Sequence, residues 1–150
     1  MHVSTIAATY HDRMEREDLG ALFAQVVRRL MDAERPLLDA HGLSMWGYSV
    51  LSRLAQQPME TQQALAKAIG YDKSRLIALL DELEGDGLLT RQPDPSNRRA
   101  HTVSLTQAGE KRLAAAKADI RAMEEDLLAD LTATEKRHLL TALPRLARQP

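Results

Sequence analysis

The fold is decided by the stretch from Asp94 to Thr106, which reads DPSNRRAHTVSLT. Its first half is rich in turn-forming residues, and its second half alternates apolar and polar side chains from His101 to Leu105. A short apolar segment, LLTR at residues 88–91, comes just before it. Alternation beside a turn cluster is typical of a β-hairpin. The sequence therefore predicts two short strands joined by a charged tip that is too long for a two-residue turn.

Two helices on a tight turn are predicted before this hairpin. Thr61 is a suitable N-cap for the first helix and Asp72 for the second, with Gly70-Tyr71 as the turn between them. The expected buried positions of the first helix are Leu65, Ala68 and Ile69. The second helix has leucines at i, i+3, i+4 and i+7, namely Leu76, Leu79, Leu80 and Leu83. Two such helices followed by a hairpin are the layout of a winged helix-turn-helix.

A long helix and a shorter one are predicted on the N-terminal side. The apolar residues in 19–38 form one stripe of a helix, and Pro36 predicts a kink, or a break with a second short helix starting near it. Gly42 ends this segment. The next helix begins at its N-cap Ser44 and ends at Pro58. Its expected apolar face consists of Val50, Leu51, Leu54 and Ala55.

Two more helices are predicted after the hairpin. Thr106 caps the first, whose apolar stripe runs from Leu113 to Leu131, and the capping box Thr132-x-x-Glu135 opens the last. These stripes, and that of the first helix, exceed what a small winged domain can cover. We expect them to pack against a second copy of the chain across a two-fold axis, with packing inside one chain as the alternative.

Composition limits the class of protein. Hydrophobic residues make up 44% and charged residues 27%, an ordinary globular balance. The net charge of −1 decides nothing about nucleic acid, because DNA responds to local charge. The chain has no cysteine, and its five histidines show no metal-ligand spacing, so we expect no metal and no cofactor. No signal peptide and no membrane-spanning run is found, which predicts a cytoplasmic protein without a membrane partner.

From about Leu19 to Leu146 the chain resembles the MarR family of bacterial winged helix-turn-helix transcriptional regulators. The strongest match is Asn97-Arg98-Arg99 followed by AHTVSLT, against the family signature D-x-R-x-x-x-x-x-L-T. Asn97 stands where the family usually has Asp. The motifs L-x-x-L-E-x-x-G-L at residues 80–88 and L-T-x-x-G-E at residues 105–110 also fit. The resemblance implies a homodimer, DNA binding, and often relief of repression by a small molecule. It divides the chain into a DNA-binding region at 44–106 and dimerisation helices at 13–43 and 107–150.

By this resemblance, the helix that begins after Asp72 is the recognition helix, whose N-terminal end enters the major groove. Lys73, Ser74 and Arg75 lie in its first turn, and Ile77 is expected to contact a thymine methyl group. Family members often carry a basic or polar residue where this chain has Ala78. A solvated helix end is the alternative interpretation of these residues.

The wing supplies a second set of expected contacts. Arg99 matches the signature arginine and is expected in the minor groove, with Arg98 on a phosphate. Asp94 and Asn97 are expected to brace the tip, and an Asn in place of Asp predicts a less rigid wing. Five further residues are candidates for contacts to the DNA backbone: Thr61, Gln62, Gln63, Arg53 and Arg91.

An effector pocket is expected by analogy near Met45, Trp46 and Tyr48, where it would suit a small aromatic or phenolic molecule. The alternative is that Trp46 belongs to the core. No arrangement of catalytic residues is recognisable, so an enzyme is not expected. The sequence thus predicts a sequence-specific transcriptional regulator, a ligand-responsive repressor that binds a pseudo-palindromic operator as a homodimer. A winged-helix module for protein interaction, without specific DNA binding, is the alternative.

Overall fold

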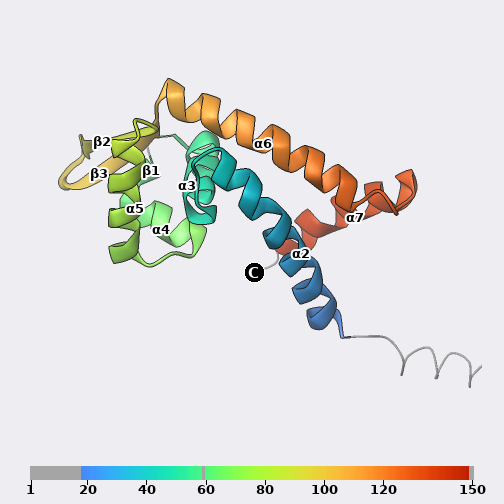
Figure 1. Ribbon diagram of the computed structural model, residues 1–150. Coiled ribbons are helices and arrows are strands. Elements are labelled where there is room, and N and C mark those ends of the chain that lie inside the picture. Colours follow the sequence, from blue (N-terminus) through green and yellow to red (C-terminus); the bar gives the residue numbers. More distant parts are fainter. Residues whose placement is uncertain (1–17, 59, 149–150) are drawn as a thin grey trace, which may run out of the picture. The chain divides into compact units, whose positions relative to one another are not determined.

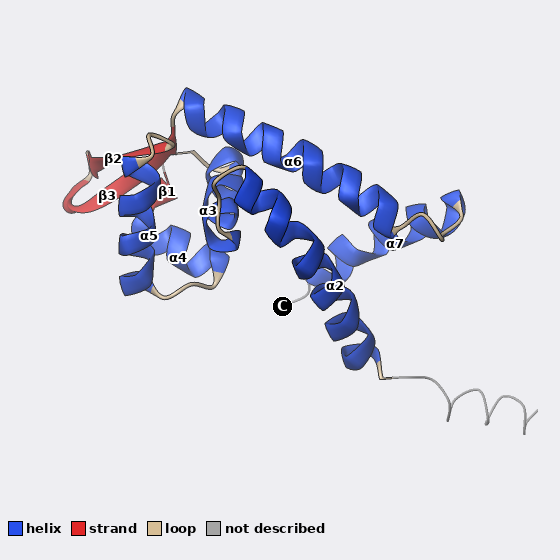
Figure 2. Cartoon of the chain, in the orientation of Figure 1, coloured by secondary structure: helices blue, strands red, loops and turns tan. Residues whose placement is uncertain are grey.

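The computed structural model describes residues 18–58 and 60–148. Within them the chain is mainly helical with one small sheet (Figures 1 and 2). The helices are α2 (Leu19–Ala40), α3 (Met45–Gln56), α4 (Gln62–Ile69), α5 (Lys73–Gly85), α6 (Gln107–Leu127) and α7 (Ala133–Ala147). The strands are β1 (Glu60–Thr61), β2 (Leu89–Asp94) and β3 (Asn97–Leu105). The predicted fold class, mainly α with a winged helix-turn-helix, is confirmed.

Local capping chemistry sets where the helices begin. At each of five helices, from α3 to α7, a side-chain oxygen accepts a hydrogen bond from a backbone N–H of the first turn, which otherwise has no partner. The caps are Ser44, Thr61, Asp72, Thr106 and Thr132. All five were predicted from the sequence. The predicted capping box of Thr132 and Glu135 is also present.

Of the two alternatives predicted at Pro36, the break is wrong, because α2 continues through this residue to Ala40, while a kink remains a prediction. Proline removes one backbone hydrogen bond inside a helix. Burial of Leu38, which is 1% exposed, anchors the turn that follows, and tertiary packing of this kind supplies most of the stability of a helix. The helix ends where predicted, before Gly42 with its positive φ of 66°.

The sheet has three strands in the order β1-β3-β2, one more than predicted (Figure 2). The extra strand β1 has only two residues, with Glu60 opposite Val103 and Thr61 opposite Thr102. A two-residue strand has no periodicity from which it could be predicted. Its pairing joins the start of α4 directly to the wing strand β3.

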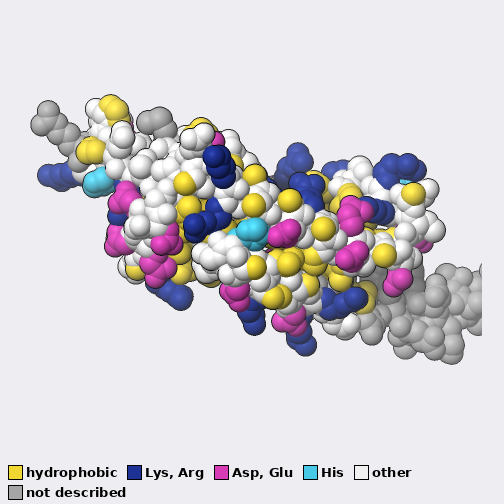
Figure 3. Space-filling model, turned by 45° about the horizontal axis from the view of Figure 1, so that its top comes forward, with side chains coloured by type: hydrophobic (Ala, Val, Ile, Leu, Met, Phe, Trp, Pro, Cys, Tyr) yellow, Lys and Arg dark blue, Asp and Glu magenta, His cyan; other side chains and the backbone are white. Residues whose placement is uncertain are grey.

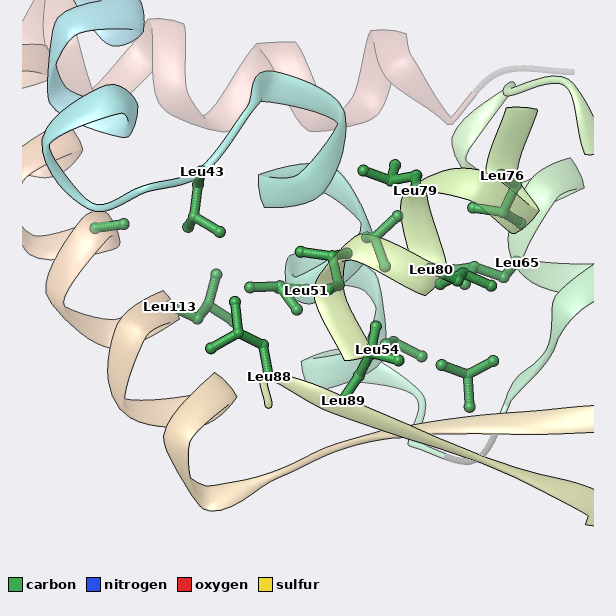
Figure 4. Packing of buried hydrophobic residues seen from close by; sticks show 14 of the residues in the cluster. Leu43, Leu51, Leu54, Leu65, Leu76, Leu79, Leu80, Leu88, Leu89 and Leu113 are labelled. Carbon is green, nitrogen blue, oxygen red and sulfur yellow. The ribbon is translucent and has the colours of Figure 1, made fainter. Parts of the chain in front are cut away.

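A leucine-rich core lies within the second of the two compact units of the chain, residues 34–150 (Figure 4). The four predicted leucines of α5 are buried in it, together with Val50, Leu51 and Leu54 of α3. Three predicted details are wrong. In α4, Ala66 is buried with Leu65 while Ala68 is exposed, and Ala55 is exposed in α3. The stripe of α6 cannot reach Leu131, because this helix ends at Leu127.

Both ends of the described chain carry exposed apolar side chains. In α7 no residue is buried, and Leu140 and Leu146 are 52% and 56% exposed. The first unit, residues 1–33, presents another set in its helical part: Leu19, Leu22, Phe23, Val26, Val27 and Met31. Residues 13–17 of the predicted dimerisation segment lie outside the described residues. No helix within 18–58 and 60–148 is long and apolar enough to cross a membrane.

Candidate nucleic-acid interface

A groove of about 510 Å³ lies between the start of α4, the start of α5 and the wing. Its lining is mostly polar. The lining residues are Thr61, Gln62, Gln63, Lys73, Asp94, Ser96, Asn97, Arg99, Ala100 and His101. Seven of these ten were predicted as DNA-contacting or wing-bracing residues from three separate segments of the sequence. The fold therefore gathers the predicted residues of both helices and the wing into one concave surface.

The first turn of α5 is held by its cap and leaves its cations exposed. Asp72 Oδ1 accepts a hydrogen bond from the Arg75 backbone N–H at 3.0 Å and another from the Ser74 hydroxyl. These bonds, that of the Ser74 side chain above all, hold the pKa of Asp72 below its usual value. Lys73 and Arg75 are exposed, as is Ile77 at 43%. Two cations and an apolar side chain thus project from the first two turns.

The wing tip is closed by short-range hydrogen bonds. Asp94 Oδ1 accepts from the Ser96 backbone N–H at 2.9 Å and from the Ser96 hydroxyl at 2.8 Å, which lowers the pKa of Asp94. Asn97 Oδ1 accepts from the Arg99 backbone N–H at 3.1 Å. Arg99 is exposed and lines the groove, while the side chain of Arg98 lies outside the described part of the chain. Both bracing candidates therefore hold backbone or hydroxyl groups of the tip.

Arg91 is engaged by two carboxylates of α5. Its Nη2 lies 2.5 Å from Asp81 Oδ1 and 3.0 Å from Glu84 Oε1, and its backbone N–H donates to Glu84 Oε2 at 2.9 Å. The side-chain bond from Arg91 is the main cause that lowers the pKa of Glu84. This arrangement, which the sequence did not predict, ties strand β2 to α5. A phosphate at Arg91 would have to compete with both carboxylates.

Arg53 is held in a similar way. Its Nε lies 3.2 Å from Glu60 Oε2, and its Nη2 donates to Gln57 Oε1 at 2.9 Å. These contacts link α3 to strand β1. Contacts of Arg53 and Arg91 to DNA phosphates remain predictions, and both side chains have structural partners within the chain.

The three residues of the predicted effector pocket lie in different surroundings, and their role in binding an effector remains a prediction. Met45 lines a hollow of about 210 Å³, while Tyr48 is half-buried and its burial raises its pKa. Trp46 is 42% exposed and stacks on Tyr71, with ring centroids 4.4 Å apart. A different cavity, of about 360 Å³, lies between the end of α3, strand β3 and α6. Its mainly apolar lining comes from three segments, which is why no local pattern pointed to it.

The two signs of charge are mixed on one face of the molecule. On the face shown in Figure 3, Lys and Arg side chains alternate with Asp and Glu. Within the groove the cations are Lys73 and Arg99, so local positive charge is compatible with a net charge of −1. Among the described residues no cluster of three or more His, Asp or Glu could hold a metal ion.

Two capped helices on a tight turn, followed by a hairpin with an arginine at its tip, define a winged helix-turn-helix protein of the DNA-binding class. The MarR family model matches residues 43–101. A transcriptional regulatory protein assigned to the hcr operon of Thauera aromatica is 30% identical over 115 residues, which are 77% of this chain and 69% of the relative. The chain therefore belongs to the MarR family, and the resemblance inferred from the wing signature is confirmed.

Solved structures agree with this membership. The transcriptional repressor CouR, solved on a 23-mer DNA duplex, is 32% identical with a TM-score of 0.76, covering 87% of this chain and 93% of CouR. The PcaV regulator of Streptomyces coelicolor, solved with its natural ligand, is 26% identical with a TM-score of 0.67, covering 88% of this chain and 96% of PcaV.

Proposed function

We propose that this protein is a cytoplasmic, homodimeric repressor of the MarR family that binds a pseudo-palindromic operator. The observation that carries the proposal is the groove that joins the start of α4, the first turn of α5 and Arg99 of the wing. A recognition helix in the major groove, with a wing arginine in the adjacent minor groove, uses each of these elements. The protein acts by binding and not by catalysis.

The exposed apolar side chains support a dimer. Those of α7 and, separately, those of the first part of α2 are exposed in the single chain. Helices at both ends of a chain commonly pair across a two-fold axis. Each protomer then presents one recognition helix to one half-site, and the half-site centres lie about 34 Å apart, one turn of DNA.

A small aromatic or phenolic effector is proposed to control the repressor. The structure of PcaV with its natural ligand supports control by a ligand, and the aromatic or phenolic class is proposed from the Trp and Tyr side chains. Met45 and Tyr48 point toward the core side of α3, whereas Trp46 stacks on Tyr71. Met45, Trp46 and Tyr48 of α3 are proposed to contribute to the effector site.

Selection of bound duplexes from a random DNA pool tests the proposal. The wild-type protein is expected to enrich a two-fold symmetric sequence, with affinity that falls steeply as salt rises. Enrichment of no sequence at moderate salt would instead favour a protein-interaction module.

Arg99→Ala is expected to weaken binding to the enriched duplex severely, by about a hundredfold, because it removes the wing cation. Lys111→Ala, which removes an exposed cation of α6 outside the groove, is the matched control. Gel-shift titration measures both, and size-exclusion chromatography checks that the dimer persists. Equal affinity of Arg99→Ala and wild type would contradict the wing assignment.

A further inference from the structure

An aromatic column ends on a cation of the recognition helix. The ring centroids of Trp46 and Tyr71 are 4.4 Å apart, with their planes inclined by 32°. The guanidinium carbon of Arg75 lies 5.4 Å from the centroid of the Tyr71 ring on which it stacks. Within about 6 Å of a ring centroid, a guanidinium is attracted to the ring face. The three side chains are therefore linked by successive contacts from α3 to the first turn of α5, an arrangement called here the column.

Each member of the column is held by capping at its own position. Trp46 lies in the first turn of α3, which Ser44 caps. Tyr71 follows Gly70, whose positive φ of 67° ends α4, and the Tyr71 backbone N–H donates to Ala66 at 3.0 Å. The backbone of Arg75 is fixed by the Asp72 cap. The column therefore fixes the direction of a long side chain that would otherwise be free in solvent.

The column holds Arg75 on the flank of α5 that faces away from the wing. Lys73 lines the groove with wing residues, and Ile77 lines the neighbouring hollow with Arg91 of β2. Arg75 is two residues from each of them, which at 100° per residue puts it about 160° around the helix axis from both. Ser74 and Ala78, opposite the buried leucines, form the centre of the exposed face.

The major groove of DNA is about 12 Å wide, and a helix with its side chains is about 10–12 Å across. A recognition helix therefore fills the groove, with a phosphate strand along each of its flanks. Lys73 lies on the flank beside the wing. We propose that the Trp46–Tyr71–Arg75 column presents the Arg75 guanidinium to a DNA phosphate at the opposite edge of the groove. This inference rests on the proposed DNA binding.

Phosphate scanning tests the contact directly. Single phosphates of the enriched duplex are replaced by neutral methylphosphonates, and binding is titrated with wild type, Arg75→Ala and Arg99→Ala. One replacement, at the edge of the groove remote from the wing, is expected to lower the affinity of wild type about tenfold. The same replacement should leave the affinity of Arg75→Ala almost unchanged, because this variant has already lost the contact. Arg99→Ala, which removes the proposed minor-groove contact of the wing, should keep the full tenfold sensitivity to that replacement. Affinity falls with salt, and the slope of log affinity against log salt should become less steep by about one in Arg75→Ala.

Variants of Tyr71 test the column itself. Tyr71→Leu keeps apolar bulk but removes the ring, so it should lose most of the coupling between Arg75 and that phosphate. Tyr71→Phe keeps the ring face and should retain the coupling, as the matched control. Trp46 is the only tryptophan of the chain, so its fluorescence should change on addition of duplex in wild type and Tyr71→Phe but not in Tyr71→Leu. Thermal melting checks that both variants are folded.

Two results would overturn the inference while leaving the proposed function intact. In one, the affinity of Arg75→Ala no longer responds to a particular base substitution but still responds to every phosphate replacement. Arg75 would then contact a base and not a phosphate. In the other, folded Tyr71→Leu keeps the full coupling, so that the column does not position Arg75. A wild-type protein that enriches no duplex would overturn the proposed function together with this inference.

Discussion

Gly109, at the start of α6, shows how closely the winged region and this helix are packed. A Cβ atom built there would lie 2.0 Å from the Leu88 carbonyl oxygen. The same carbonyl accepts from the Thr106 backbone N–H at 3.1 Å, and the Thr106 hydroxyl donates to the Gly87 carbonyl at 2.6 Å. The contact involves backbone on both sides, so neither a rotamer change nor a side-chain shift can relieve it.

Gly109→Ala is therefore expected to lower the free energy of unfolding by about 2–3 kcal/mol. Gly85→Ala is the matched control, because its Cβ would meet nothing within 4 Å and alanine favours the helix by about 1 kcal/mol. Urea denaturation followed by circular dichroism measures both. Equal stability of Gly109→Ala and wild type would mean that α6 does not pack this closely on Leu88.

The wing departs from the family signature at Asn97. Its side chain accepts a hydrogen bond from the Arg99 backbone N–H, a bond that a carboxylate would make more strongly. A neutral amide also offers no ion pair to a neighbouring arginine. A less rigid wing tip, caused by Asn97 in place of Asp, remains a prediction.

At the level of elements, Arg91 couples strand β2 to α5 in a pH-dependent way. Because its hydrogen bonds favour the carboxylate form, the pKa of Glu84 in the folded protein lies below its unfolded value. The stabilisation is therefore complete at neutral pH and is lost as pH falls through the folded-state pKa. Arg91→Met should lower the melting temperature at pH 7, and the difference from wild type should shrink at pH 3. Thermal melts at both pH values measure this, and a difference that grows at acidic pH would contradict it.

The sequence predicted those elements whose signals are local. Ser44, Thr61, Asp72, Thr106 and Thr132 were predicted as caps, because a cap and its partner lie within three residues. Strand β1 was missed, because two residues cannot show alternation. The partners of Arg91 were missed for another reason: acidic residues on an exposed helix face are usually solvated, and only the fold brings Asp81 and Glu84 to β2.

The candidate site was predicted better than its effector pocket. The groove unites Thr61, Lys73 and Arg99 because the winged helix-turn-helix layout fixes their order in space as well as in sequence. Met45, Trp46 and Tyr48 are close in sequence, yet successive residues of a helix point about 100° apart. Closeness in sequence therefore does not by itself bring them to one face of α3, and the effector pocket remains a prediction.

For the whole molecule, the exposed leucines of α7 lead to a prediction about assembly. Leu140→Glu should dissociate the proposed dimer, because it places a charge among apolar side chains that a second copy covers. Thr141→Glu, at an exposed neighbouring position of α7, is the control. Sedimentation velocity should show a monomer for the first variant and a dimer for the second. A dimeric Leu140→Glu protein would place the interface elsewhere.

The small strand β1 has a consequence for how such a repressor can be switched off. Its pairing with β3 joins α4 to the wing, and Arg91 joins β2 to α5, so the two helices and the root of the wing are braced as one rigid head. With these braces in place, we do not expect the wing to release DNA by bending at its root. We therefore expect allosteric control by rigid-body rotation of the two heads of the dimer. Such a rotation changes the distance between the heads, so that it no longer matches the helical repeat of the operator.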